Sequence, residues 1–299
     1  MSRFTRMLRD LPARLFLAEA DPRVYSAVRI VFSAVALINL IVLWPQREMW
    51  LTDGGMIDQA ALRPVHVTPY LTLFSMFTES LGVSLYMIFS AIALVCLMLG
   101  IAPRWAAVAV FVWHVSYATR GAIALTGWDP ALRSVSFLLM LSPLPAVWSP
   151  GGKRQPPEAL RAPCLNYGLT LIRVQLLVLY WQAVLDRLDS EFWMNGEFMT
   201  YYLLSHNARW PGLWVMQWEW AATLLTWGVQ VFELVLPLLL FSRRWHLPAI
   251  VLGTAFHAGI YLLSHNLLLF LLAMLVFYTA FLRGEDLDRA QAWLKQRHQ

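Results

Sequence analysis

Charged residues are scarce in this sequence. Only 14% of its 299 residues are Asp, Glu, Lys or Arg, against about 25% in a typical soluble domain. So few charges cannot cover a water-exposed surface of this size. The hydrophobic content of 59% and the mean hydropathy of +0.55 indicate that lipid is the main solvent instead.

Cysteine is nearly absent as well. Cys96, inside an apolar run, and Cys164, beside Pro163, can form neither a disulfide framework nor a cysteine-based zinc site. The net charge of +5 comes mainly from arginines at the ends of hydrophobic stretches. A nucleic-acid-binding protein instead gathers its positive charge on one face with stacking aromatics. We therefore expect no nucleic-acid partner.

Long apolar runs are what the sequence has in quantity. Runs of about 17 to 25 residues, the length of a transmembrane helix, predict helices at 26–44, 81–100, 105–123, 131–148, 168–187, 219–241, 246–263 and 267–283. The last two could form one bent helix, but about 36 residues would rise about 54 Å against a hydrocarbon core of about 30 Å. We therefore predict an all-α, polytopic integral membrane helix bundle with about eight transmembrane helices.

The basic residues predict the orientation. With a cytoplasmic N-terminus, fifteen Lys and Arg residues fall on the cytoplasmic side and six on the other. Cytoplasmic loops carry an excess of Lys and Arg. Both termini are therefore predicted to be cytoplasmic.

Three segments follow from this arrangement. Residues 1–25 are arginine-rich with helically spaced apolar residues and lack a cleavage site, so we expect a cytoplasmic amphipathic interfacial segment and no cleaved signal. Residues 26–283 form the transmembrane domain, whose longer outer loops, 45–80 and 188–218, should contain short helices at the membrane mouth. Residues 284–299 read as a short cytoplasmic amphipathic tail.

Arg173 and Glu233 are two of the charged residues that lie inside the predicted helices. An ionisable group within the bilayer costs about 2.5 to 3.5 kcal/mol, so each needs a reason. Arg173 and Glu233 lie at similar depths from the cytoplasmic side and could pair. Such a pair would either pin two helices together or take part in headgroup binding or proton movement. Pro237, one turn after Glu233, should free a carbonyl near them.

The outer ends of the helices collect further polar residues. Asp129 and Pro130 predict a helix start, with Arg120 and Arg133 within reach of the carboxylate. This cluster is either a cap with ion pairs or a polar site open to the outer leaflet. At the end of another helix, Tyr180 and Arg187 lie seven residues apart and so share one face, and Trp193 follows. That pattern fits either a helix that leaves the membrane with anchoring side chains at its end or a functional site.

Histidines add a third element. His206 and His265 belong to outer segments, and His257 lies about two turns deeper in the helix that ends at His265. No HxxxH or HxxE spacing places them on one helix face, so we expect no metal site. A histidine acting as a hydrogen-bond partner or as a general acid or base is the better expectation. The pentapeptide Leu-Leu-Ser-His-Asn occurs at 203–207 and 262–266 but is too short to indicate a repeat architecture.

Short motifs in order along nearly the whole chain carry a family resemblance. They are Trp50–Ile57, Arg173–Gln175 continuing through Tyr180 and Ala183 to Trp193 and Gly196, Glu233 with Pro237, and Phe256–Ile260. Together they resemble the HTTM family, which includes the vitamin K-dependent γ-carboxylases and similar bacterial proteins. The resemblance implies a helical membrane domain, here in a bacterial inner (cytoplasmic) membrane.

In the carboxylases the resemblance implies deprotonation of a lipid hydroquinone, its conversion by oxygen to an epoxide, and carboxylation of a glutamate side chain. The family's base is a lysine, and Arg187 stands at that position here. Arginine stays protonated near neutral pH and cannot serve as a base. The sequence has two lysines, Lys153 and Lys295, and both are predicted to be cytoplasmic. The family's lysine chemistry is therefore not expected.

Two functions remain open. In the first, a lipophilic substrate, a quinone such as a vitamin K-like hydroquinone or a lipid, meets a periplasm-facing site. Arg187, Asp129, His206 and His265 are then the candidate catalytic residues, with Arg187 binding an anionic oxygen or carboxylate and a histidine accepting the proton. The substrate-binding candidates are Arg120, Tyr180, Trp193, His257, Arg173 and Glu233. In the second, the protein is a non-catalytic membrane component that binds a lipid, quinone or peptide and assists the maturation or export of a partner protein.

Overall fold

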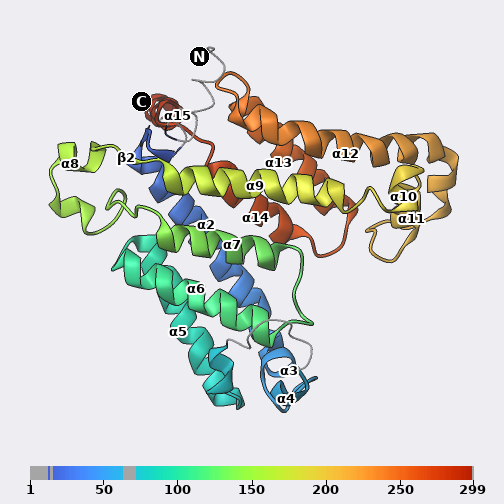
Figure 1. The fold of residues 1–299 in the computed structure, drawn as a ribbon, viewed down its shortest axis with the longest axis horizontal. Helices are drawn as coiled ribbons and strands as arrows, with labels where there is room; N and C mark the ends of the chain where they lie inside the picture. Colours follow the sequence, from blue (N-terminus) through green and yellow to red (C-terminus); the bar gives the residue numbers. More distant parts are fainter. Residues whose placement is uncertain (1–12, 14–15, 63–71, 298–299) are drawn as a thin grey trace, which may run out of the picture. The chain divides into compact units, whose positions relative to one another are not determined.

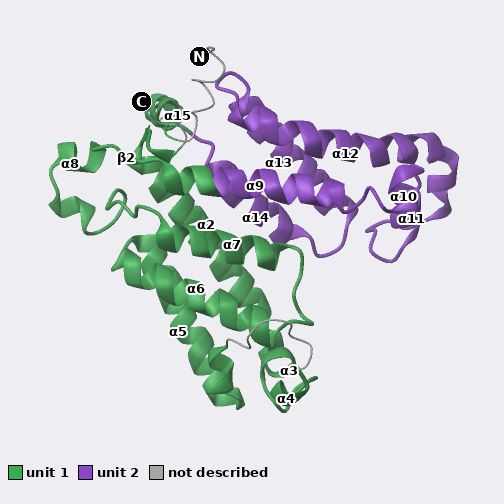
Figure 2. Cartoon of the chain, viewed as in Figure 1, with its two compact units in different colours: residues 1–171, 283–299 green, residues 172–282 purple. Residues whose placement is uncertain are grey.

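The computed structural model describes residues 13, 16–62 and 72–297. Most of the expected interfacial segment 1–25 therefore lies outside the described residues. The regular secondary structure of the described residues is almost entirely helical (Figure 1). It forms two compact units, residues 1–171 with 283–299 and residues 172–282 (Figure 2). Each unit is described by itself.

The first unit is built on four apolar helices: α2 (Pro22–Leu43), α5 (Ser80–Leu99), α6 (Pro103–Arg120) and α7 (Trp128–Leu141). Helix α5 packs on α2 and α6, and α6 packs on α7. The core between them is fully buried and apolar, with Val28, Phe32, Leu94, Val110 and Val135 at its centre. Burial of these apolar side chains between the helices stabilises the unit.

Short elements complete the first unit. Strand β1 (Glu19–Ala20) pairs antiparallel with β2 (Cys164–Leu165). The segment between α2 and α5 contains the 3-10 turns η1 (Trp44–Gln46) and η3 (Leu73–Ser75) and the helices α3 (Arg47–Leu51) and α4 (Gln59–Leu62). The segment after α7 adds η4 (Gly152–Arg154) and α8 (Pro157–Arg161), and the C-terminal helix is α15 (Gly284–Arg297).

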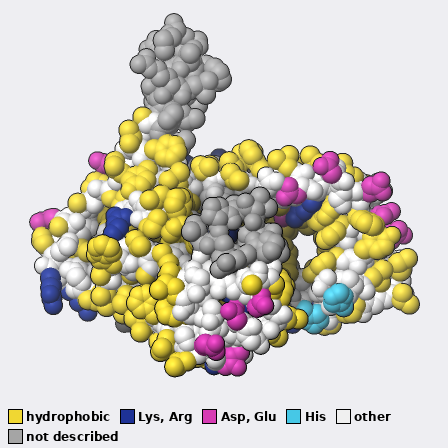
Figure 3. Space-filling model, turned by 60° about the horizontal axis from the view of Figure 1, so that its bottom comes forward, with side chains coloured by type: hydrophobic (Ala, Val, Ile, Leu, Met, Phe, Trp, Pro, Cys, Tyr) yellow, Lys and Arg dark blue, Asp and Glu magenta, His cyan; other side chains and the backbone are white. Residues whose placement is uncertain are grey.

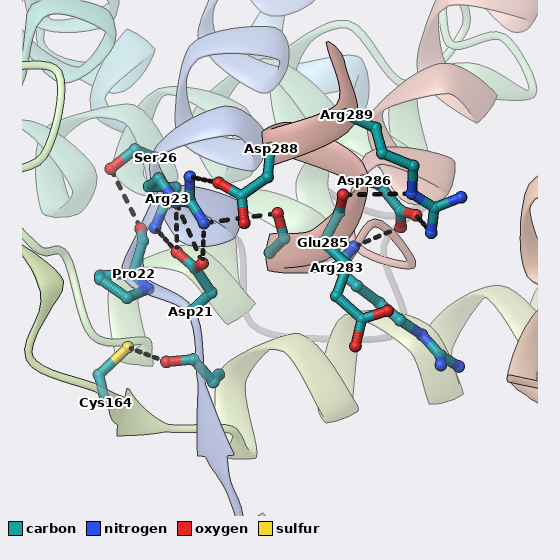
Figure 4. Close-up of polar contacts among 12 residues, drawn as sticks. Asp21, Pro22, Arg23, Ser26, Cys164, Arg283, Glu285, Asp286, Asp288 and Arg289 are labelled. Atoms are coloured by element: carbon teal, nitrogen blue, oxygen red, sulfur yellow. Dashed lines mark hydrogen bonds and ion pairs between the residues drawn. The ribbon is translucent and has the colours of Figure 1, made fainter. Parts of the chain in front are cut away.

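Helix α2 starts at a cap that also holds α15. Asp21 accepts a hydrogen bond of 2.8 Å from the Arg23 backbone N–H, and Pro22 supplies a preset φ for the first turn. The Arg23 guanidinium bonds Asp21 and reaches Asp288 of α15 at 2.6 Å (Figure 4). Arg23 therefore ties the start of the chain's first long helix to its last helix.

Helix α9 (Tyr167–Leu185) begins in the first unit, and its residues from 172 onward belong to the second unit. The second unit also contains three further long helices: α12 (Glu219–Phe241), α13 (His246–Leu263) and α14 (Leu268–Thr279). Helix α13 packs on both α12 and α14. Between α9 and α12 lie α10 (Glu191–Met194), α11 (Phe198–Leu204) and the 3-10 helix η5 (Leu213–Trp218), and α11 packs on α12. The short helices expected in both outer loops are thus confirmed.

The all-α membrane fold predicted from the sequence is confirmed. Among the described residues, five helices are long and apolar enough to cross a bilayer: 22–51, 80–99, 167–185, 213–241 and 246–263. A bent pair formed by α14 and α15 would make a sixth. The number of crossings and the side of each terminus stay predictions.

One predicted helix is shorter than its apolar run. The run 131–148 predicts a helix to residue 148, but α7 ends at Leu141. Pro143 and Pro145 follow directly, and proline disfavours a helical residue before it and cannot continue the hydrogen-bond ladder. The 14 residues of α7 rise about 21 Å, less than the roughly 30 Å of a hydrocarbon core.

Candidate functional site

Three polar side chains meet inside the second unit. Tyr180 of α9, His257 of α13 and Tyr278 of α14 are 3%, 2% and 1% exposed. Tyr180 Oη shares a hydrogen bond of 2.8 Å with His257 Nε2 and lies 2.5 Å from Tyr278 Oη. Three apolar helices therefore converge on one buried hydrogen-bonded chain, which we call the Tyr-His-Tyr chain.

A glycine makes room for this chain. Gly253 lies one turn before His257 on the same face of α13. A Cβ at this position would collide with Tyr278 Oη and lie 3.0 Å from Leu236 Cδ2. The missing side chain is what allows the Tyr278 hydroxyl to approach the backbone of α13.

His257 has an unused ring nitrogen. Its Nδ1 is buried and has no hydrogen-bond partner among the described residues. Phe256 and Phe270 meet the imidazole edge to face, each with ring centroids 5.0 Å away. An apolar surrounding cannot satisfy this nitrogen, and an unpaired polar atom away from water is costly. The atom is thus free to bond a ligand.

An ion pair forms near the end of α9. Arg187, just past the helix, pairs with Glu233 of α12, whose side chain is buried. The Arg187 guanidinium also lies over the Trp193 ring, 4.2 Å from its centroid. A cation over an indole face is attracted to it. One cluster is therefore formed by Arg187, Glu233 and Trp193. The sequence alone did not predict this cluster.

The predicted pair of Arg173 with Glu233 is wrong. Arg173 Nε donates instead to the Ala280 carbonyl at 2.8 Å, and its guanidinium lies 5.8 Å from the Phe281 ring centroid. Ala280 is the C-cap of α14. Carbonyls at a helix C-terminus lack intrahelical partners and carry partial negative charge, so they attract a guanidinium. Arg173 thereby stabilises the end of α14.

The outer histidines lie on the surface and in paired segments. His206 and His265 are both exposed. Ala208 and Ser264 form an isolated antiparallel bridge, and the His265 backbone N–H donates to the Asn207 carbonyl at 3.0 Å. In Figure 3 histidine side chains (cyan) lie next to one another on one face. Their predicted catalytic role stays a prediction.

In the first unit, Arg120 organises the loop that contains residues 52–57. It is 2% exposed and donates to the carbonyls of Thr52 at 2.6 Å and Ile57 at 2.9 Å. Its ion-pair partner is Asp53, at 3.4 Å. The expected pair with Asp129 is therefore wrong, because the loop carbonyls of the 50–57 motif occupy the guanidinium.

Asp129 lies in the first turn of α7, as the predicted helix start requires. Its carboxylate accepts hydrogen bonds of 2.8 Å from both the backbone N–H and the hydroxyl of Thr126. Asn39 of α2 donates to it at 3.1 Å. Asp129 therefore fastens the loop before α7 and links it to α2, which is a structural role. A contribution to catalysis stays a prediction.

Two residues of structural weight escaped the sequence analysis. Tyr278 sits in an apolar run where only its hydroxyl distinguishes it. Arg29 is 1% exposed and donates to the carbonyls of Leu97 at 2.6 Å, Met98 at 2.9 Å and Val147 at 3.2 Å. The sequence did show that Arg29 is a charge within an apolar run. Its partner carbonyls could be identified only from the folded structure.

Comparison with known proteins decides the family. Residues 18–285 match the HTTM domain. The chain belongs to the HTTM family. The uncharacterized protein YitO of Bacillus subtilis (strain 168) is 24% identical to this HTTM chain over 270 residues, covering 84% of the chain and 82% of YitO. The sporulation-delaying protein SdpB of the same organism is 28% identical over 178 residues, covering 55% of the chain and 53% of SdpB. No solved structure matches.

Proposed function

We propose that this HTTM protein binds a lipophilic ligand with a polar head, a quinone or a lipid, in its second unit, within the inner membrane of a bacterium. The observation that carries the proposal is the buried Nδ1 of His257, which has no hydrogen-bond partner within the described part of the chain. Within a bilayer, water is not available to satisfy such an atom. A carbonyl or hydroxyl of a ligand supplies the missing partner.

The Tyr-His-Tyr chain suits a head group that exists in two forms. If Tyr180 donates to Nε2, the imidazole proton sits on Nδ1, which then donates to a ligand carbonyl. If Nε2–H donates to Tyr180, Nδ1 instead accepts from a ligand hydroxyl. A quinone carbonyl fits the first direction and a quinol hydroxyl fits the second. This match favours a quinone-type ligand over an ordinary phospholipid.

Arg187 is the proposed contact for negative charge. One of its terminal nitrogens bonds Glu233, and the other N–H groups of the guanidinium are donors for an anionic group. The pairing holds the guanidinium in place over Trp193. A role as base remains excluded because arginine keeps its proton. In a reaction, a histidine such as His257 would accept the proton while Arg187 binds the anionic oxygen.

The test is mass spectrometry of lipids and quinones extracted from gently purified protein. Wild type is compared with His257→Phe, which keeps an aromatic ring and removes the nitrogens. His114→Phe is the matched control, because His114 is a buried histidine of the first unit. We expect wild type and the control to retain one specific quinone or lipid and His257→Phe to lose it. Identical bulk phospholipid in all three proteins would refute the proposal.

A second candidate function is a non-catalytic one. The name of the relative SdpB, a sporulation-delaying protein, describes a cellular process and no reaction. That likeness leaves room for the alternative stated from the sequence, in which this chain assists the maturation or export of a partner protein or peptide. The two functions separate by experiment: a partner that co-purifies equally with wild type and His257→Phe from native membranes supports the second. A protein isolated alone from those membranes counts against it.

A further inference from the structure

Helices α11 and α13 end in the same way. Each closes with Leu-Leu-Ser-His-Asn, at 203–207 and 262–266. In both, the second Leu is the last helical residue and the Ser is an extended C-cap, with ψ of 164° at Ser205 and 155° at Ser264. The same five residues thus make the same exit twice. Each exit puts a histidine directly outside its helix.

The two exits are joined through their backbones. Ala208 pairs with Ser264, the Arg209 N–H donates to the Leu263 carbonyl at 2.8 Å, and the His265 N–H donates to the Asn207 carbonyl at 3.0 Å. His265 directly follows one bridge residue, and His206 stands two residues before the other. Residues 59 positions apart in sequence are therefore held on one small surface.

Side chains hold this surface in place. The Arg209 guanidinium donates to the carbonyls of Tyr261 at 3.1 Å, Leu262 at 3.0 Å and Ser264 at 3.0 Å. These carbonyls lie at the C-terminal end of α13, where intrahelical partners run out. Tyr202 of α11 donates to the Ser264 hydroxyl at 2.5 Å. The frame that carries the two histidines is thus braced from both helices, which favours a preorganised site.

The imidazoles themselves are unused. Neither His206 nor His265 makes a side-chain hydrogen bond to any residue within 16–62 or 72–297, and both are exposed. Imidazole is the commonest protein ligand for metal ions and suits Zn²⁺, Cu²⁺ and Ni²⁺. The described chain offers no group of three or more His, Cys, Asp or Glu side chains around an ion. Water or an external ligand would fill the other positions.

We propose that His206 and His265 form a two-imidazole binding site for a divalent late transition metal ion on the surface of the second unit. Single-helix spacing gave no sign of it, because the ligands come from two chain segments that only folding joins. Copper should bind most tightly, since affinities of nitrogen sites peak at Cu²⁺. Mg²⁺ and Ca²⁺ should not bind, because they require oxygen ligands. The site is independent of the Tyr-His-Tyr chain and of its ligand.

The test is a Cu²⁺ titration of the purified full-length protein, followed by electron paramagnetic resonance. Wild type should show coordination by two imidazole nitrogens at one equivalent of copper. His206→Ala and His265→Ala should each lose the two-nitrogen signature, and the double variant should look no different from either. Asn207→Ala, an exposed neighbour between the same segments, is the matched control and should keep the signature.

Folding is checked by thermal melting without metal, which should be the same in all variants because both histidines are exposed. Zn²⁺ or Ni²⁺ should then raise the melting temperature of wild type and Asn207→Ala but of neither histidine variant, because a ligand that binds only the folded state stabilises it. A copper signature that survives either single substitution, or that disappears with only one of them, overturns the proposal. So does a wild type without imidazole coordination.

Discussion

At the residue scale, the absence of one side chain decides the geometry of the buried site. Gly253 lets the Tyr278 hydroxyl press against α13, where it meets Tyr180 and, through it, His257. Polar groups buried this deeply are stable only when their hydrogen bonds are made. The site therefore depends on a residue that contributes no chemistry of its own.

Replacing that glycine tests the point. Gly253→Ala places a methyl group against Tyr278 Oη, so the phenol must move and the Tyr-His-Tyr chain is disturbed. Overpacking of a well-packed core costs about 1–3 kcal/mol, and we expect a loss of that size in detergent-solubilised protein. Gly259→Ala on the same helix is the control, because its Cβ would meet nothing within 4 Å. Equal melting temperatures for both variants would contradict this account.

At the scale of elements, arginines bind the C-terminal ends of three long helices. Arg173 binds the end of α14, Arg209 binds the end of α13, and Arg29 binds the end of α5. Unpaired C-terminal carbonyls attract guanidinium groups, and lipid offers no water to replace them. Of the three arginines that the sequence offered as site candidates, Arg173 thus binds a helix end, Arg120 binds the 52–57 loop and Asp53, and Arg187 pairs with Glu233.

The tether of α15 gives a pH dependence. Burial acts to raise the pKa of Asp21, but hydrogen bonds from Arg23 outweigh it, so the pKa falls below its ordinary value of 3.8. The hydrogen bond from Arg23 likewise lowers the pKa of Asp288. A carboxyl with a lowered folded-state pKa stabilises at pH above its unfolded value, and this contribution is lost as the pH falls through the folded value.

We therefore expect α15 to be held at neutral pH and to loosen below about pH 4. Hydrogen exchange of its amides, corrected for the intrinsic effect of pH, measures this. Asp288→Asn should exchange faster at neutral pH and lose most of the pH dependence, whereas Lys295→Gln, which removes an exposed charge from the other end of the same helix, should behave as wild type. Unchanged exchange in Asp288→Asn would show that the tether does not hold the helix.

At the scale of the whole molecule, the positive-inside bias makes a testable prediction of topology. Two single cysteines are introduced after replacement of Cys96 and Cys164: Gly151→Cys in the expected cytoplasmic loop and Asn207→Cys in the expected outer segment, both exposed positions. A membrane-impermeant thiol reagent should label Asn207→Cys in cells with a permeable outer envelope and Gly151→Cys only after the inner membrane is opened. The reverse pattern would invert the orientation.

The sequence by itself determined the class of fold and the approximate place of the long helices, because the apolar runs that lipid requires can be counted residue by residue; the end of α7 at Leu141 is the exception. It also placed four residues among the candidates: Glu233 as a charge within an apolar run, His257 as a histidine two turns deep in its helix, and Tyr180 and Arg187 as polar residues on one face at a helix end. Only the tertiary structure decided the partners: Arg187 with Glu233, Arg120 with the 52–57 loop, and the segments of His206 and His265 with each other. The physical reason is that a helical sequence specifies which face a residue occupies. Which neighbour it meets depends on how the helices pack. A long arginine side chain can reach several neighbouring groups, so its partner is the hardest to predict.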